Sequence, residues 1–153
     1  MQRASAFDCA LRVLALRDHS EAELRRKLKA KGYDEPEVTE SVTRLQELGY
    51  LDDTRFARCF AESSIRNGRG YGARLRQELA RRGVAGAIVQ ETLAELSEEF
   101  EETGVLASTM ERRYPGFVPA AATDKEIRRI VAYLQRKGFT LGAILAALKT
   151  NSI

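Results

Sequence analysis

The sequence repeats a helix–glycine–helix pattern three times along its length. The segments LRRKLKAKGY, LRQELARRGV and IVAYLQRKGF superimpose on their glycines, which are Gly32, Gly83 and Gly138. In each segment an apolar residue lies eight and four positions before the glycine, and another follows it directly. These spacings predict an amphipathic helix that ends at a glycine with positive φ and is followed by a second helix. Repeats of about fifty residues indicate stacked helical units that share a core.

A further helix-like segment precedes each of these pairs, at residues 4–18, 53–67 and 98–114. Alternating apolar and polar runs of the strand type are missing from the sequence. The sequence therefore predicts an all-α fold of three tandem three-helix repeats that form an elongated, curved helical-repeat molecule. The predicted units are residues 1–49, 50–97 and 98–153.

The stretch GYLDDTRFA places two adjacent carboxylates, Asp52 and Asp53, where the first two units meet. Such a pair can belong to a metal site or an acid/base pair, or it can begin a helix. A carboxylate metal site needs further oxygen ligands nearby, and none is identifiable. We therefore predict that the two aspartates cap and begin the helix that follows. Capping boxes at Ser20-Glu-Ala-Glu23 and Thr123-Asp-Lys-Glu126 predict two other helix starts.

The composition fits a folded protein without a membrane segment. Hydrophobic residues make up 44% and charged residues 31% of the chain, which are ordinary values for a soluble globular protein. No N-terminal segment has the pattern of a signal peptide, and the longest uncharged C-terminal stretch, before Lys149, is too short to span a bilayer. Cys9 and Cys59 lie in no metal-ligand or CxxC spacing, so we expect reduced thiols. These features predict a cytoplasmic protein.

Residue types that support catalysis or cofactor binding are scarce. His19 is the only histidine, and with Asp18 and Ser20 it cannot form a productive catalytic triad from three consecutive positions. Two cysteines and one histidine are too few for a zinc site, and no phosphate-loop or dinucleotide-binding motif is present. We therefore predict that the protein is not an enzyme and takes no cofactor or metal. The stretch GRGYG at residues 68–72 is expected to be a flexible hinge that lets Arg69 reach a phosphate.

Charge is unevenly distributed, although the net charge is only +3. Basic residues gather on the helix that ends at each repeated glycine, and the richest group lies within residues 66–82. An acidic block follows at residues 91–102. Many of these bases could simply solvate outer helix faces or complement helix dipoles. Because the arginine fork suits phosphates and carboxylates, a surface that binds a polyanion or a protein is the stronger interpretation.

Four motifs give the chain a resemblance to a known family. HSEAELRRKLKAKGY, LQELGYLDDTRFARCF, GRGYGARLRQELARRGV and LQRKGF occur in order and together resemble the bacterial RecX regulatory proteins over residues 10–149. The resemblance implies three tandem three-helix repeats without catalytic activity. It also implies a modulator of the RecA recombinase that binds along the RecA–DNA filament, typically in its helical groove. Such proteins limit filament growth or promote disassembly, which lowers strand exchange, ATP hydrolysis and coprotease activity, and some members bind DNA.

The resemblance makes the RecA filament the predicted partner, with single- or double-stranded DNA as a second one, and we expect a monomer. The alternatives are a DNA-binding helical module without a recombinase partner and a purely structural adaptor. The third unit departs from the family pattern, because its stretch SEEFEETGVLASTMERRY is more acidic than the helix usual there. The candidate contacts to RecA or DNA are the basic residues Arg25, Arg26, Lys29, Arg66, Arg69, Arg74, Arg76, Arg81, Arg82, Arg128, Arg129, Arg136 and Lys137.

Overall fold

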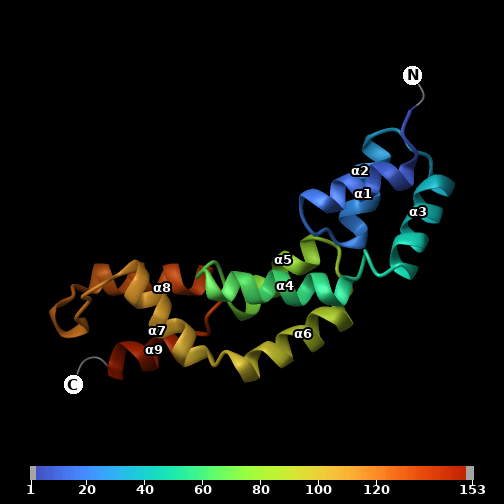
Figure 1. Ribbon diagram of the computed structural model, residues 1–153. Helices are drawn as coiled ribbons and strands as arrows, with labels where there is room; N and C mark the ends of the chain where they lie inside the picture. The colour runs from blue at the N-terminus through green and yellow to red at the C-terminus, as the bar shows by residue number, and fades with distance from the viewer. Residues whose placement is uncertain (1–2, 151–153) are drawn as a thin grey trace.

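The computed structural model describes residues 3–150 of the chain. Within that range the protein forms nine α-helices and one short 3-10 helix, without a strand. The helices follow one another along an elongated, curved body that has the two chain termini at opposite ends (Figure 1). The predicted all-α fold of tandem three-helix repeats is confirmed.

Each repeat consists of three consecutive helices. Repeat 1 contains α1 (Ala6–Leu16), α2 (Glu21–Ala30) and α3 (Glu35–Glu47). Repeat 2 contains α4 (Asp53–Arg66), α5 (Gly72–Arg81) and α6 (Gly86–Glu99). Repeat 3 contains α7 (Glu102–Arg113), α8 (Asp124–Arg136) and α9 (Leu141–Thr150), with the 3-10 helix Pro119–Ala121 in the loop before α8.

The hydrophobic core is divided unevenly among the repeats. Repeat 1 packs on a cluster of its own, in which Leu24 and Leu28 of α2 are fully buried, as their spacing before the repeated glycine predicts. A small second cluster lies within repeat 2. The largest cluster crosses from repeat 2 into repeat 3 and joins Leu75 and Leu96 to Leu106 and other residues of α7, α8 and α9. Repeats 2 and 3 therefore share one core, whereas repeat 1 has a separate one.

The predicted helix ends are confirmed in their geometry. The repeated glycines all have positive φ, 96° at Gly32, 82° at Gly83 and 103° at Gly138. Both predicted capping boxes are closed. Asp52 is the N-cap of α4, and its carboxylate accepts two backbone amides, those of Thr54 at 3.0 Å and Arg55 at 3.1 Å.

The prediction that a helix begins at residue 98 is wrong. α6 continues through Glu99, and α7 begins only at Glu102, after an extended turn at Phe100 with φ −123°. The Phe100 carbonyl accepts the Tyr71 hydroxyl at 2.7 Å, which ties this break to repeat 2. Gly104 lies inside α7 and does not interrupt it. The unit boundaries stay a prediction, and the one between residues 97 and 98 would fall in the last turn of α6.

Tyr71 anchors the glycine-rich stretch for which the sequence suggested a flexible hinge. The residue is 8% exposed, and its ring stacks on Phe139 with 5.5 Å between centroids. Its backbone amide donates to the Lys137 carbonyl at 2.8 Å. Because the stretch is held against repeat 3, the expectation of a flexible hinge at residues 68–72 is wrong.

Candidate interaction surface

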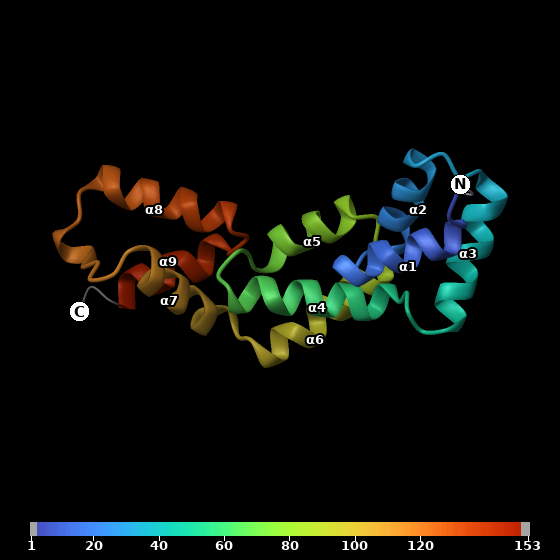
Figure 2. The ribbon, with the colours of Figure 1, turned by 45° about the horizontal axis from the view of Figure 1, so that its top comes forward.

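The second helices of the three repeats form a row along one side of the molecule. Figures 1 and 2 both show α8, α5 and α2 following one another along the same edge. We call these three helices the second-helix row. It is the part of the fold that carries most of the predicted contact residues.

Equivalent hydrogen bonds join the helices of the row end to end. The C-cap carbonyl of α5, at Arg82, accepts the Ser20 hydroxyl at the N-cap of α2, at 2.5 Å. The C-cap carbonyl of α8, at Lys137, accepts the amide of Tyr71 at the N-cap of α5, at 2.8 Å. Both acceptor residues, Arg82 and Lys137, lie one position before a repeated glycine. Both donor residues, Ser20 and Tyr71, lie twelve positions before a repeated glycine. The row therefore follows from the sequence repeat, because equivalent positions join each pair of helices. It also aligns the dipoles of the three helices head to tail.

Unpaired arginines line this row in all three repeats. Arg76 and Arg81 on α5 are exposed and form no ion pair with any described residue. Exposed guanidinium groups of this kind are ready donors for phosphate or carboxylate oxygens. The same description holds for Arg26, Arg128, Arg129 and Arg136.

Other predicted contact residues in the row already have partners within the chain. These ion pairs lie at the surface, where such pairs contribute about 0–1 kcal/mol and can open for another anion. They are Arg25 with Glu21 at 3.3 Å, Lys29 with Glu35 at 2.5 Å and Arg74 with Glu78 at 2.7 Å, while Lys137 lies 5.5 Å from the Tyr133 ring centroid.

Two predicted contact residues lie outside the row. Arg66, at the end of α4, pairs with Glu62 at 3.0 Å and lies over the Phe100 ring. Arg69 follows in the loop before α5, is exposed, and has no ion-pair partner among the described residues. The structure therefore does not gather the predicted residues on one face.

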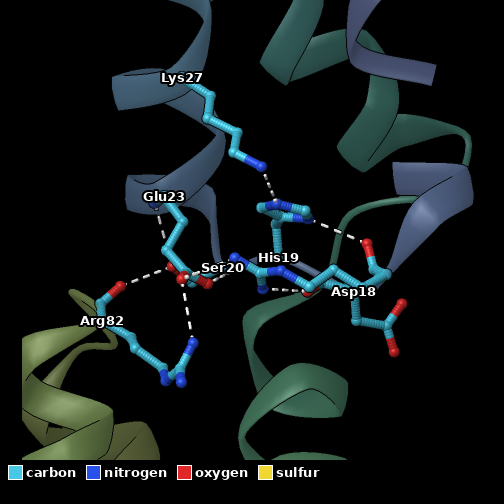
Figure 3. Close-up of polar contacts among 7 residues, drawn as sticks. Asp18, His19, Ser20, Glu23, Lys27 and Arg82 are labelled. Atoms are coloured by element: carbon cyan, nitrogen blue, oxygen red, sulfur yellow. Dashed lines mark hydrogen bonds and ion pairs between the residues drawn. The ribbon is translucent and has the colours of Figure 1, made fainter. Parts of the chain in front are cut away.

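Repeats 1 and 2 meet through polar groups, which Figure 3 shows in close-up. The Glu23 carboxylate accepts the Ser20 amide at 3.1 Å and Arg82 of repeat 2 at 3.1 Å, and it pairs with Arg17 at 3.4 Å. Burial alone would raise the pKa of Glu23, but the bonds from Ser20 and Arg17 and the charge of Arg82 outweigh it and hold the pKa low. We call this contact region the polar junction.

His19 is buried beside this region, with 2% of its surface exposed. Its Nδ1 lies 2.9 Å from the Arg17 carbonyl, and the Lys27 ammonium lies 3.3 Å from Nε2 (Figure 3). Only a neutral ring with the proton on Nδ1 satisfies both contacts. Burial lowers the pKa of His19 and outweighs the hydrogen bond to the Arg17 carbonyl, which raises the pKa. The charges of Arg17 and Lys27 lower the pKa further.

Asp53 caps a helix of the other repeat. Its carboxylate accepts the backbone amide of Glu21 in the first turn of α2, at 2.8 Å. Burial raises the pKa of Asp53 and outweighs that hydrogen bond, which lowers the pKa. The charges of Glu21 and Asp52 raise the pKa further. The pair that looked like an acid/base motif thus caps two helices, α4 through Asp52 and α2 through Asp53.

The acidic block lies on the side of the molecule opposite to the row. α6 runs below α4 in Figures 1 and 2, while α5 lies above it. Glu95 and Glu99 of α6 pair with Arg58 of α4 at 3.4 and 2.5 Å. The glutamates of α6 and the arginines of α5 therefore lie on opposite sides of α4.

Three residues lie at the contacts between repeats although the sequence did not predict this role for them. Asp53 accepts the Glu21 amide of repeat 1, and no local pattern reveals this contact. Arg17 pairs with Glu23 of its own repeat, and the same carboxylate also binds Arg82 of repeat 2. Tyr71 could have been suspected, since a large aromatic within a glycine-rich stretch needs a packing partner. Its partner Phe139 is distant in the sequence.

Residues 3–150 contain no group of three or more His, Cys, Asp or Glu residues placed to hold a metal ion. None of the helices in this range is long and apolar enough to cross a membrane. The two cysteines are free, Cys9 half-buried and Cys59 exposed.

These features define an all-α tandem-repeat protein with a basic row of helices. Two family models, described as the first and second three-helix domains of RecX, match residues 6–45 and 52–93. The chain belongs to the RecX family of regulatory proteins, which is not known as a family of enzymes.

The similarity to RecX proteins extends over nearly the whole chain. "Regulatory protein RecX" of Trichlorobacter lovleyi is 39% identical over 138 residues, which cover 90% of each chain. The protein of the same name from Thermus thermophilus is 40% identical over 145 residues, which cover 94% of this chain and 90% of the relative. The crystal structure of RecX from Lactobacillus salivarius shares the fold, with a TM-score of 0.73 at 19% identity over 95% of this chain and 93% of that one.

Proposed function

We propose that this RecX protein binds the RecA–DNA filament and limits its growth or stability. Such binding lowers strand exchange, DNA-dependent ATP hydrolysis and coprotease activity. The single observation that carries the proposal is the second-helix row, which presents exposed, unpaired arginines in all three repeats. The proposal takes the protein to act as a monomer in the cytoplasm.

An elongated row suits a repetitive partner such as a protein filament. Several weak contacts along one rigid body bind more tightly than any single contact, because later contacts form at a high effective concentration. Guanidinium groups can meet acidic side chains of the filament or phosphates of its DNA. Such contacts weaken as salt is added.

A titration of DNA-stimulated ATP hydrolysis by the cognate RecA tests this function. We expect inhibition at amounts well below one protein per RecA protomer, which indicates action on filament growth and not simple occlusion. Unchanged hydrolysis at equimolar protein would contradict the proposal.

A double charge reversal tests the row itself. Arg74→Glu with Arg76→Glu should weaken inhibition while leaving the helical content unchanged, since both side chains are exposed. Arg12→Glu with Arg55→Glu is the matched control, because it reverses two exposed arginines outside the row. Equal inhibition by the two double variants would rule out Arg74 and Arg76 as important contacts.

A DNA-binding module without a recombinase partner is the second candidate, favoured by the same arginines. It predicts binding to bare duplex DNA with strong sequence preference and no effect on RecA. Electrophoretic mobility shifts on duplexes of differing sequence distinguish it from the filament regulator.

A further inference from the structure

A cavity of about 440 Å³ lies at the polar junction. Arg17 contributes to its wall from repeat 1, while Arg69 and Arg82 contribute from repeat 2. The remaining lining residues are Asp18, Phe56, Cys59, Phe60, Ser63 and Ser64. We call it the junction cavity, and we propose that it binds a phosphate group of the DNA backbone. This proposal rests on the proposed function for its choice of DNA.

The charges of the lining favour an anion. The lining contains three arginines and one acidic residue, Asp18. Arg17 and Arg82 both bind the same Glu23 oxygen, at 3.4 and 3.1 Å, so they approach each other closely. A guanidinium has five N–H donors, so each retains free donors after that bond. Arg69 has no ion-pair partner among the described residues, and its charge is therefore uncompensated.

Neutral groups of the cavity fit the same ligand. The Ser64 hydroxyl forms no hydrogen bond within the described part of the chain, so it is available as a donor. The Phe60 ring lies 4.5 Å from the Arg82 guanidinium and holds that group in place. A positioned arginine loses less conformational entropy on binding than a free one.

The number of converging donors favours a phosphate over a carboxylate as the ligand of the cavity. A phosphate presents oxygens in several directions, whereas a carboxylate presents two in one plane, so donors that converge from several sides suit a phosphate better. The cavity is also larger than a phosphate ion, which leaves room for the adjoining sugar. A bound phosphate would link repeat 1 to repeat 2 where no hydrophobic cluster joins their helices.

Oligonucleotide binding with a single arginine removed tests the site. Arg69→Ala should bind labelled oligothymidylate about tenfold more weakly, which is the effect of losing one charge-assisted hydrogen bond. The slope of log K against log salt should fall by about 0.7, as expected for one lost phosphate contact to a single strand. Arg12→Ala, an exposed arginine on α1 outside the cavity, should leave both quantities unchanged. Arg69→Lys should keep the salt slope.

Cys59 offers a direct report of occupancy, because its exposed thiol lines the same cavity. Saturating oligothymidylate should slow alkylation of Cys59 and not that of Cys9, which lies on α1 and serves as the internal control. The protection should be lost in Arg69→Ala. Protection by inorganic phosphate without protection by the oligonucleotide would overturn the assignment to DNA.

Other outcomes separate this site from its alternatives. Wild-type affinity and salt slope in Arg69→Ala would overturn the proposal. Weaker binding of poly-glutamate by Arg69→Ala, with unchanged oligonucleotide binding, would assign the cavity to an acidic protein segment instead. If the protein leaves RecA hydrolysis unchanged but Arg69→Ala loses the oligonucleotide, the phosphate site stands and the filament function fails.

Discussion

The two contacts between successive repeats use the same helix ends and different chemistry around them. At the polar junction, Ser20 bonds to the end of α5, and Glu23 and Arg82 form an ion pair beside it. At the contact of repeats 2 and 3, Tyr71 bonds to the end of α8 and stacks on Phe139 within the shared hydrophobic cluster. We call this second contact the apolar junction.

The same helix-end geometry can therefore recur along the chain while different side chains set the strength of each junction. A hydrogen bond contributes a net 0.5–1.5 kcal/mol or so, whereas burying one large apolar side chain contributes about 1.5–3 kcal/mol. We therefore expect repeats 2 and 3 to unfold as one body and repeat 1 to separate from them at a lower free energy.

The largest effect is expected from Gly138→Ala at the apolar junction. An added Cβ would lie 1.9 Å from the Tyr71 carbonyl oxygen and 2.7 Å from the Arg74 amide, and both are backbone atoms in a packed core. The free energy of unfolding in urea should fall by about 3–5 kcal/mol. Gly49→Ala is the control, since its φ is also positive but nothing lies within 4 Å, and it should cost about 1–2 kcal/mol. Equal losses of unfolding free energy in the two variants would show that the apolar junction rearranges to accommodate the added Cβ.

Gly83→Ala makes the equivalent change at the polar junction. Here the added Cβ would lie 2.3 Å from the Ala22 Cβ of repeat 1, so the repeats must move apart. We expect a loss of about 2 kcal/mol, mostly from positive φ, because no shared core is disturbed. Hydrogen exchange should speed up at the Glu21 amide and stay unchanged in repeat 3. Faster exchange throughout repeat 3 would contradict the independence of the two junctions.

Ser20→Ala and Thr123→Ala compare two capping boxes, of which only the first lies at a junction. Each variant loses a helix cap, which costs about 1 kcal/mol. Ser20→Ala also leaves the Arg82 carbonyl without its 2.5 Å partner, so its loss should be about 1 kcal/mol greater. Chemical denaturation of both variants measures the difference, and equal losses would make that bond energetically unimportant.

The smallest effect is expected from pH. The pKa of His19 is lowered in the fold, so its ordinary value near 6.5 applies only to the unfolded chain. The contribution of His19 to stability should be constant well above pH 6.5 and fall as the pH drops through that value, because the unfolded chain then takes up the proton first. The slope cannot exceed about 1.4 kcal/mol per pH unit for one group. Thermal unfolding between pH 7.5 and 5.5 measures it, and His19→Gln should remove it.

Local interactions made much of the fold predictable. The helix that ends at Gly83, the capping box at Ser20 and the N-cap at Asp52 depend on neighbours within a few positions, and all three are confirmed. The prediction of a helix start at residue 98 is wrong, since the break falls at Phe100, whose carbonyl accepts the hydroxyl of the distant Tyr71. The basic residues of the candidate contact surface could be identified from the sequence, whereas their contacts to RecA or DNA stay a prediction.

The sequence was sufficient to predict the tandem helical repeat, since apolar periodicity and glycine ends act within single helices. It also determined the family, through motifs that run in order along the chain. The stacking of the repeats, and no local pattern, brings Arg17, Arg69 and Arg82 to one cavity and Asp53 to a helix of another repeat. The physical reason is that these contacts join residues far apart in the sequence, whose approach depends on how the repeats stack.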